Sequence, residues 1–211
     1  MKLVFTAVNA ERVFNAAAVF AVTDSGRPIL GGVLLESVSD NRETVTIYAT
    51  DSYKLIRITA KLEVQGVEGH AVEGGAPVIL GAKSLLTGLK YILASEKRGA
   101  YVVLESDGVT ASLTNILSGA TAGVEVIEGT YPNAASLIGT AGYSDTFEGA
   151  AFNPVFLGDI AGAAVKFHGT KKMTNTGALK LERADRNRPA HFVTRSEETG
   201  ELLALLMPVR I

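Results

Sequence analysis

Residues that could do chemistry are few and scattered in this sequence of 211 residues. The three histidines, His70, His168 and His191, lie far apart, and none has the His-x₃-His spacing of a metal site. Cysteine is absent, which excludes disulfides, thiol nucleophiles and cysteine-ligated zinc. The glycine pairs at 31–32 and 74–75 lack the Lys-Ser/Thr of a phosphate-binding loop. We therefore expect no catalytic residue, no metal site and no cofactor.

Acidic residues near the C-terminus are the one group that could serve an enzyme. They are Asp185, Glu197, Glu198 and Glu201. All of them flank predicted hairpin turns, where solvated acids are the usual case. A small metal-dependent nuclease stays an alternative, which a metal-dependent assay on duplex and single-stranded DNA would decide.

Residues 49–55 (ATDSYKL) form a polar turn between two apolar, alternating runs. Asp51 and Ser52 suit such a turn because their short side chains can hydrogen-bond the backbone nearby. Tyr53 and Lys54 then project from a fixed base at the edge of a sheet. An ordinary hairpin corner is the alternative to a binding surface.

Composition points to a globular protein that does not bind nucleic acid through bulk charge. Hydrophobic residues make up 47% of the chain, enough for a packed core, and the formal net charge is −2. Binding to phosphates normally needs a basic face, so any DNA role must depend on local charge or on topology. No apolar run is long enough to cross a bilayer and no signal-type cleavage site follows Met1, so we expect a cytoplasmic protein with no membrane partner.

The order of predicted elements repeats along the chain. The first unit has a strand over 2–8, a helix over about 10–22 with Asn9 as its N-cap, and strands over 29–38, 44–49 and 55–64. The second has a strand over 78–80, a helix over 82–95, and strands over 101–105, 109–113 and 121–127. Both units have the order βαβββ.

A third βαβββ unit completes the chain after a linker of small residues. It has a strand over 147–152, a helix to about 167 with Asn153 as N-cap and Pro154 at its first position, and strands over 178–183, 190–194 and 202–207. The predicted fold class is α+β, with a full domain over residues 1–138 and a half-domain over 139–211. An unpaired half-domain exposes apolar surface and strand edges, so we expect it to dock onto another chain.

Four segments together resemble the bacterial sliding clamp family, the beta subunit of DNA polymerase III. They are residues 27–36 (RPILGGVLLE), 49–55 (ATDSYKL), 128–133 (EGTYPN) and 205–211 (LLMPVRI). The resemblance implies the DNA-clamp fold and the work of a non-enzymatic processivity factor in replication. A typical member has six βαβββ units, so this chain resembles a shortened, phage- or mobile-element-like form. Lys54 stands where the family usually has Arg, which keeps the charge without the planar fork.

The resemblance also implies a cleft that binds short apolar-aromatic peptides of polymerases, clamp loaders and other replication proteins. Residue by residue, the cleft comprises Thr50, Ser52, Tyr53, Lys54, Leu55, Pro132, Leu137, Leu205, Met207, Pro208, Val209 and Arg210. Leu and Met form an adaptable apolar floor, and a lysine at the rim can meet polar groups of a peptide. For Met207 and Pro208, a final core strand ended by proline is the alternative.

Helices line the central hole in this family, which implies that their polar faces contact duplex DNA. Lys83, Thr87 and Lys90 lie at i, i+4 and i+7, on one stripe of the second helix. The other residues expected to face DNA are Lys97, Arg98, Lys166, Lys171 and Lys172. An ordinary solvated lysine face is the alternative to weak, sequence-independent phosphate contacts.

Rings in this family and its eukaryotic counterparts contain twelve units. Four copies of a three-unit chain supply twelve, so we expect a homotetramer with isologous contacts, third unit to third unit and first unit to first unit. A homotrimer is the runner-up, if a divergent linker replaces a missing unit. The alternative function is a clamp decoy or modulator, which binds clamp partners without encircling DNA.

Overall fold

The computed structural model describes residues 1–22, 26–37, 42–63, 67, 69–95, 97–138, 150–169, 178–183 and 188–209. Its elements follow the predicted repeat. The first unit comprises β1 (Lys2–Thr6), α1 (Ala7–Ala18), the short 3₁₀ helix η1 (Pro28–Gly31), β2 (Gly32–Ser37), β3 (Thr44–Thr50) and β4 (Lys54–Lys61). The second comprises β5 (Val78–Gly81), α2 (Ala82–Ile92), β6 (Tyr101–Ser106), β7 (Ala111–Asn115) and β8 (Thr121–Val124). The third contains α4 (Pro154–His168), β9 (Lys180–Arg183), β10 (Ala190–Ser196) and β11 (Gly200–Leu206), and α3 (Ala134–Ile138) precedes it.

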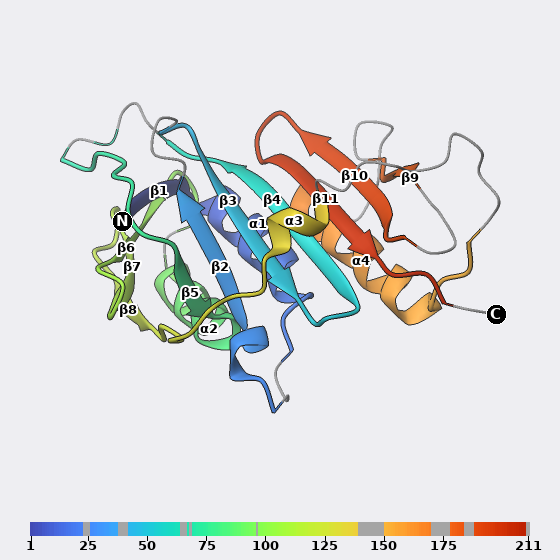
Figure 1. Cartoon of the computed structure of the whole chain (residues 1–211). Coiled ribbons are helices and arrows are strands. Elements are labelled where there is room, and N and C mark those ends of the chain that lie inside the picture. Colours follow the sequence, from blue (N-terminus) through green and yellow to red (C-terminus); the bar gives the residue numbers. More distant parts are fainter. Residues whose placement is uncertain are drawn as a thin grey trace.

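Two sheets hold these strands. A four-stranded sheet has the order β1-β6-β7-β8, and a seven-stranded sheet has the order β5-β2-β3-β4-β11-β10-β9. The first and second units are interlocked because each contributes its first strand to the other unit's sheet, β1 beside β6 and β5 beside β2. In Figure 1 the second unit lies at the left end, the first in the middle and the third at the right.

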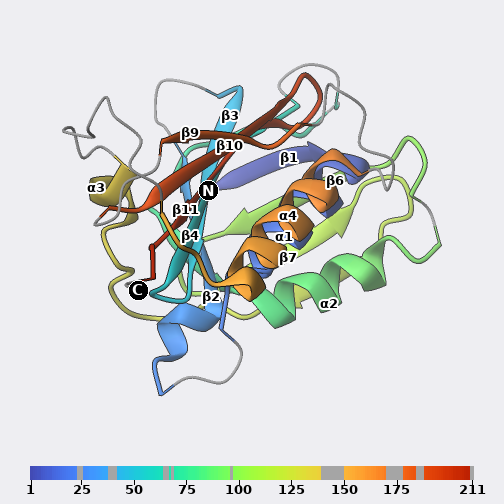
Figure 2. The same ribbon diagram turned by 90° about the vertical axis from the view of Figure 1, so that its right-hand side faces the viewer.

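The helices α1, α2 and α4 cover the inner faces of the sheets. Figure 2 shows α4 and α1 close together, with α2 beyond α1, and α1 contacts both of the other helices. The main core lies between helices and sheets, and its largest fully buried side chains include Phe5, Phe14, Phe20 and Phe167. No helix in the described part of the chain is long and apolar enough to span a membrane.

A second apolar cluster covers the outer face of the seven-stranded sheet. Residues 125–138 run across that face, with Ile127 hydrogen-bonded to Ile79 and Tyr131 and Ala134 packed on the sheet. The short helix α3 in this segment is absent from the sequence prediction, which has a loop there. β8 correspondingly ends at Val124 instead of residue 127, because the chain turns there to pair with β5.

The first helix begins earlier than predicted, with Thr6 rather than Asn9 as its N-cap. The Thr6 hydroxyl accepts a hydrogen bond of 3.1 Å from the Asn9 backbone N–H, as an N-cap does for the third helical residue. Asn9 lies inside the first turn, buried, and its side chain donates to the carbonyl of Lys61. The prediction was wrong here because Asn9 is fixed by β4, which is distant in the sequence.

Other element bounds differ in smaller ways. Pro28 starts a 3₁₀ turn, so the predicted strand over 29–38 begins only at Gly32. The predicted strand over 147–152 falls largely outside the described residues, and within 150–152 only Ala151 makes a bridge, to Val209. The N-cap Asn153 and Pro154 at the first position of α4 are confirmed.

The pairing of β4 with β11 joins the first and third units. The strands are antiparallel, with Lys54 opposite Leu206 at one end and Ala60 opposite Gly200 at the other. Beneath them α1 packs on α4, and ion pairs join Arg12 to Glu198 (2.6 Å) and Arg57 to Glu201 (2.9 Å). The expected contact of first unit to first unit is therefore wrong, because the free edge that it needs is occupied by the third unit of the same chain.

We expect Gly200→Ala to lower the free energy of unfolding by at least about 2 kcal/mol. Gly200 has φ of 113°, and a Cβ atom there would overlap the carbonyl oxygen of Thr59 on β4. Urea unfolding at fixed protein concentration measures the effect. Gly162→Ala in α4 is the control, because a Cβ at Gly162 meets no atom within 4 Å and alanine favours helix. An equal decrease in the free energy of unfolding in both variants would contradict the predicted strain at residue 200.

Candidate functional site

The turn between β3 and β4 is held by a closed set of hydrogen bonds. The Asp51 carboxylate accepts from the backbone N–H groups of Tyr53 (2.9 Å) and Lys54 (2.8 Å). The Thr50 hydroxyl donates to the Lys54 carbonyl and accepts from Ser52. Ser52 has φ of 79°, the left-handed region, which a short polar side chain tolerates best after glycine. The turn is a rigid base from which Tyr53 projects.

Lys54 does not project from this turn. Its side chain is only 6% exposed, and its ammonium group makes ion pairs with Asp51 (2.8 Å) and Asp159 of α4 (3.1 Å). The same group donates to the Val19 carbonyl at the C-terminal end of α1, where partial negative charge favours a cation. The expectation that Lys54 lies at a rim and meets a peptide is therefore wrong.

Aromatic rings complete the surroundings of Lys54. Its Nζ atom lies 5.3 Å from the ring centre of Phe20 and 5.4 Å from that of Phe156, within the range of cation–π attraction. Phe156, on α4, also stacks on Tyr53, with ring centres 5.9 Å apart and ring planes 21° apart. Lys54 thus connects the turn of the first unit to the helix of the third.

An exposed apolar surface lies beside this connection. Tyr53 is 64% exposed, Met207 45% and Val209 46%. The Met207 backbone N–H donates to the Tyr53 carbonyl (3.2 Å), and Val209 N–H donates to Ala151 (2.7 Å). We call Tyr53, Phe156, Met207 and Val209 the corner surface; it combines two of the segments that the family resemblance assigned to one cleft.

Several predicted cleft residues are buried instead. Leu55 and Leu205 are paired across β4 and β11 and lie in the outer cluster together with Ala134. Thr50 is buried within the turn. None of these three side chains is exposed to a ligand in this structure. Pro208 is half-buried, and Arg210 lies outside the described residues.

Pro132 and Leu137 lie on the segment that crosses the outer face. Pro132 lines a hollow of about 320 Å³ with Glu36, Tyr48 and Asn133, which the sequence did not predict. Burial, with the nearby Glu36 carboxylate, raises the pKa of Tyr48. Burial also raises the pKa of Tyr131 far above its usual range, so its phenol stays neutral and donates to the Gly32 carbonyl. Leu137 is exposed on α3.

The predicted DNA-facing stripe on α2 is exposed. Lys83 and Lys90 point to solvent, and neither makes an ion pair with any described residue. Thr87 is also exposed, and its hydroxyl donates to the Lys83 carbonyl. Lys83 and Lys90, with Thr87 between them, therefore form an exposed polar stripe with two positive charges on α2.

The remaining predicted DNA-facing residues are less uniform. Lys97 makes an ion pair with Glu11 of α1, which uses part of its charge. Arg98 and Lys166 are exposed. Lys171 and Lys172 lie outside the described residues.

Two of the acidic residues near the C-terminus make structural ion pairs. Glu198 binds Arg12, and Glu201 binds both Arg57 and Arg195. Asp185 lies outside the described residues. Within the part of the chain that is described, no three His, Cys, Asp or Glu side chains are grouped as metal ligands. His168 shares a hydrogen bond of 2.7 Å with Thr194, and burial, together with Arg12, lowers its pKa.

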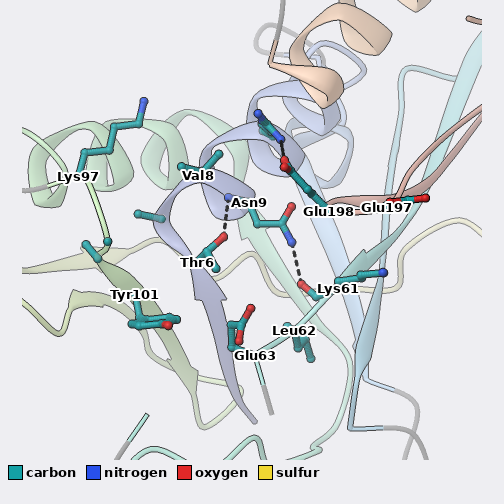
Figure 3. Close-up of a pocket in the computed structure, with 14 residues that line it drawn as sticks. Thr6, Val8, Asn9, Lys61, Leu62, Glu63, Lys97, Tyr101, Glu197 and Glu198 are labelled. Atoms are coloured by element: carbon teal, nitrogen blue, oxygen red, sulfur yellow. Dashed lines mark hydrogen bonds and ion pairs between the residues drawn. The ribbon is translucent and has the colours of Figure 1, made fainter. Parts of the chain in front are cut away.

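A cavity of about 620 Å³ lies at the N-terminal end of α1, opposite the end that contacts Lys54 (Figure 3). Asn9 of α1 and its N-cap Thr6 line one side, Lys61 lines it from the end of β4, and Glu198 lines it from the turn between β10 and β11. The Asn9 carboxamide oxygen is buried there, with no hydrogen-bond partner among the described residues. Charges of both signs surround this cavity, and they give it no clear preference for a ligand.

The sequence matches no protein-family model and no curated protein. Among solved structures, the fold is similar to the DNA polymerase III beta chain of Streptococcus pneumoniae, with TM-score 0.71, 17% identity, and coverage of 100% of this chain and 65% of that chain. The sliding clamp (DNA polymerase III subunit beta) of Bartonella birtlesii, bound to griselimycin, gives TM-score 0.71, 17% identity and coverage of 100% and 66%. For the DNA polymerase III beta subunit of Thermotoga maritima, the TM-score is 0.67 and the identity is 13%. The match covers 100% of this chain and 65% of that chain. The chain has the DNA-clamp fold and spans about 65% of the length of these clamps.

Replacing the buried ammonium group tests how the corner surface is built. Lys54→Met should lower the free energy of unfolding by about 3 kcal/mol, because two carboxylates lose their cation. Chemical denaturation measures this, and Lys90→Met, at an exposed lysine, is the control and should change stability by less than about 0.5 kcal/mol. Asp159→Asn should lower the free energy of unfolding by less in the Lys54→Met variant than in the unmodified protein, because its ion-pair partner is already absent there. Equal effects of the two lysine substitutions would show that Lys54 does not join the units.

Proposed function

We propose that this chain is a DNA sliding clamp, a replication processivity factor that encircles duplex DNA as a homo-oligomeric ring and holds polymerase on it. The observation that carries the proposal is the match of the whole chain to about two thirds of clamp structures, with TM-scores near 0.7. Clamp function requires no catalytic group.

The arrangement of layers supports DNA passing on the helix side. The helices α1, α2 and α4 lie together on one side of the sheets (Figure 2). Lys83 and Lys90 of α2 are exposed, and neither makes an ion pair with a residue that the structure describes. Contacts between a few lysines and phosphates are weak and independent of sequence, so a ring held by them can slide. A net charge of −2 disfavours tight electrostatic binding, so retention has to come from topology.

The corner surface supports peptide binding. Tyr53 offers a rigid aromatic face, and Met207 offers a flexible apolar one beside it. Peptides of polymerases and clamp loaders that carry apolar and aromatic residues are the ligands that such a surface fits. Lys54 supports the surface from inside rather than contacting the peptide.

Self-association follows from the unit count. Each chain has three units, so a homotetramer contains twelve, the number in clamp rings. We favour the homotetramer, with a homotrimer as the runner-up. The protein then works in the cytoplasm at the nucleoid, of a bacterial cell or an infected host cell.

Replacing Lys83 and Lys90 by Glu should weaken retention on DNA without changing peptide binding, because the stripe and the corner surface are separate. Retention on nicked circular DNA after gel filtration measures this, and linearising the DNA should release the unmodified protein. Lys61→Glu with Lys180→Glu is the charge-matched control, since both lysines lie on strands. A protein that never remains on circular DNA yet binds clamp partners would be a decoy.

A polymerase-tail peptide should bind with roughly micromolar affinity, about −8 kcal/mol. Removing Met207 to Ile211 should abolish binding, because the corner surface loses its Met207 side. Tyr53→Ala should weaken it at least tenfold, and Tyr91→Ala, at an exposed tyrosine of α2, is the control. Fluorescence anisotropy measures the affinities. If a folded Tyr53→Ala variant binds the peptide with unchanged affinity, the corner surface is not the peptide site.

A further inference from the structure

The chain shows how the last strands of two units join. β4 ends the first unit and β11 ends the third, and the two pair antiparallel along their whole length. Helices of the same two units, α1 and α4, pack beneath the paired strands. In this junction the last strand of one unit therefore pairs with the last strand of another.

The second unit has the same last strand without a partner. β8 pairs with β7 on one side, and it is the outermost strand of its sheet, so no described strand lies on its other side. The helix α2 covers its inner face closely, since a Cβ at Gly88 would lie 3.3 Å from the Ala122 side chain. The second unit therefore presents half of the junction that the other two units complete.

The β8 edge lacks the features that keep edge strands from pairing. Its residues Thr121, Ala122, Gly123 and Val124 include no charge and no proline. Thr121 and Gly123 are exposed, and a Cβ at Gly123 would meet no atom within 4 Å. An uncharged, open edge of this kind favours addition of another strand.

Apolar side chains flank the same edge. Ser84, Gly88 and Tyr91 lie on one stripe of α2, and Ser84 and Gly88 contact residues of β8 and Glu125. Tyr91 continues this stripe and is 65% exposed. Leu117, in the turn before β8, is 58% exposed. A partner that extends the sheet would cover both.

We infer that β8 pairs antiparallel with β8 of a second copy of this chain, around a two-fold axis. This inference deepens the proposed ring and rests on it. The partner is β8 itself because β4 and β11, the other last strands, are already paired with each other in every copy. The antiparallel direction follows the β4–β11 example, and α2 then packs on α2 of the partner as α1 packs on α4.

The contact sets the parity of the ring. Each β8–β8 junction consumes two chains, so a ring closed through it contains an even number of copies, and four copies supply twelve units. The order of units is second, first, third, then third, first, second of the next chain. The contact of third unit to third unit, where the outer edge of β9 is free of described strands, closes the other side.

Gly123→Arg tests the junction, because the arginine has open space in a single chain and blocks a strand at the β8 edge. Mass in solution at micromolar concentration should fall from about four times 22.1 kDa to about two times. Gly26→Arg is the matched control: a Cβ at Gly26 also meets nothing within 4 Å, and the mass should not change. Circular dichroism verifies that both variants are folded.

A second measurement remains decisive if Gly123→Arg fails to fold. The chain contains no cysteine, so Thr121→Cys and Gly123→Cys each introduce a single thiol. In an antiparallel pair around a two-fold axis, a residue near the axis faces its own copy. We expect mild oxidation to give a disulfide-linked dimer in at least one of these variants and none in a Gly26→Cys control.

The outcomes separate this junction from the clamp function. A folded Gly123→Arg variant with unchanged mass, absence of a specific disulfide in both cysteine variants, or an unmodified protein that is a trimer each overturns the β8 junction. Retention on circular DNA would still support the clamp in those cases. An unmodified protein that stays monomeric and leaves circular DNA overturns both.

Discussion

The antiparallel ladder between β4 and β11 is the interaction on which the rest of the molecule depends. It joins strands far apart in the sequence, and it fixes their register, since a slip of one residue would turn Leu205 from the outer cluster toward the helices. The ladder also brings Leu203 and Leu205 of the third unit into the outer cluster, with Tyr131 and Ala134 of the segment that crosses the sheet. The corner surface exists at one end of the ladder and the cavity of Figure 3 at the other.

Lys54 shows how a charge can serve such a junction. A buried ammonium group is costly unless carboxylates and hydrogen bonds replace its water. Here Asp51 comes from its own turn and Asp159 from the third unit, so one of the two ion pairs of the ammonium group forms only when the two units are together. A lysine that the family resemblance assigns to ligand binding thus contributes to assembly of the fold.

Local patterns predicted the repeat, the helix cap at Asn153 and the exposed stripe of Lys83 and Lys90, because each depends on neighbouring residues. Contacts between distant segments could not be predicted in this way. Nothing near Lys54 in the sequence indicates Asp159, and nothing in the alternation of β4 selects β11 over a strand of another chain. The clearest errors, at Lys54, Asn9 and the first-unit edge, all arise from such contacts.

The stack of Tyr53 on Phe156 makes the corner surface a property of two units at once. A ligand that rests on both rings binds only while the first and third units are joined, so binding and joining are thermodynamically linked. A ligand present at 100 times its dissociation constant adds about 2.7 kcal/mol to the joined state. A ligand bound at this surface therefore makes separation of β4 from β11 less favourable.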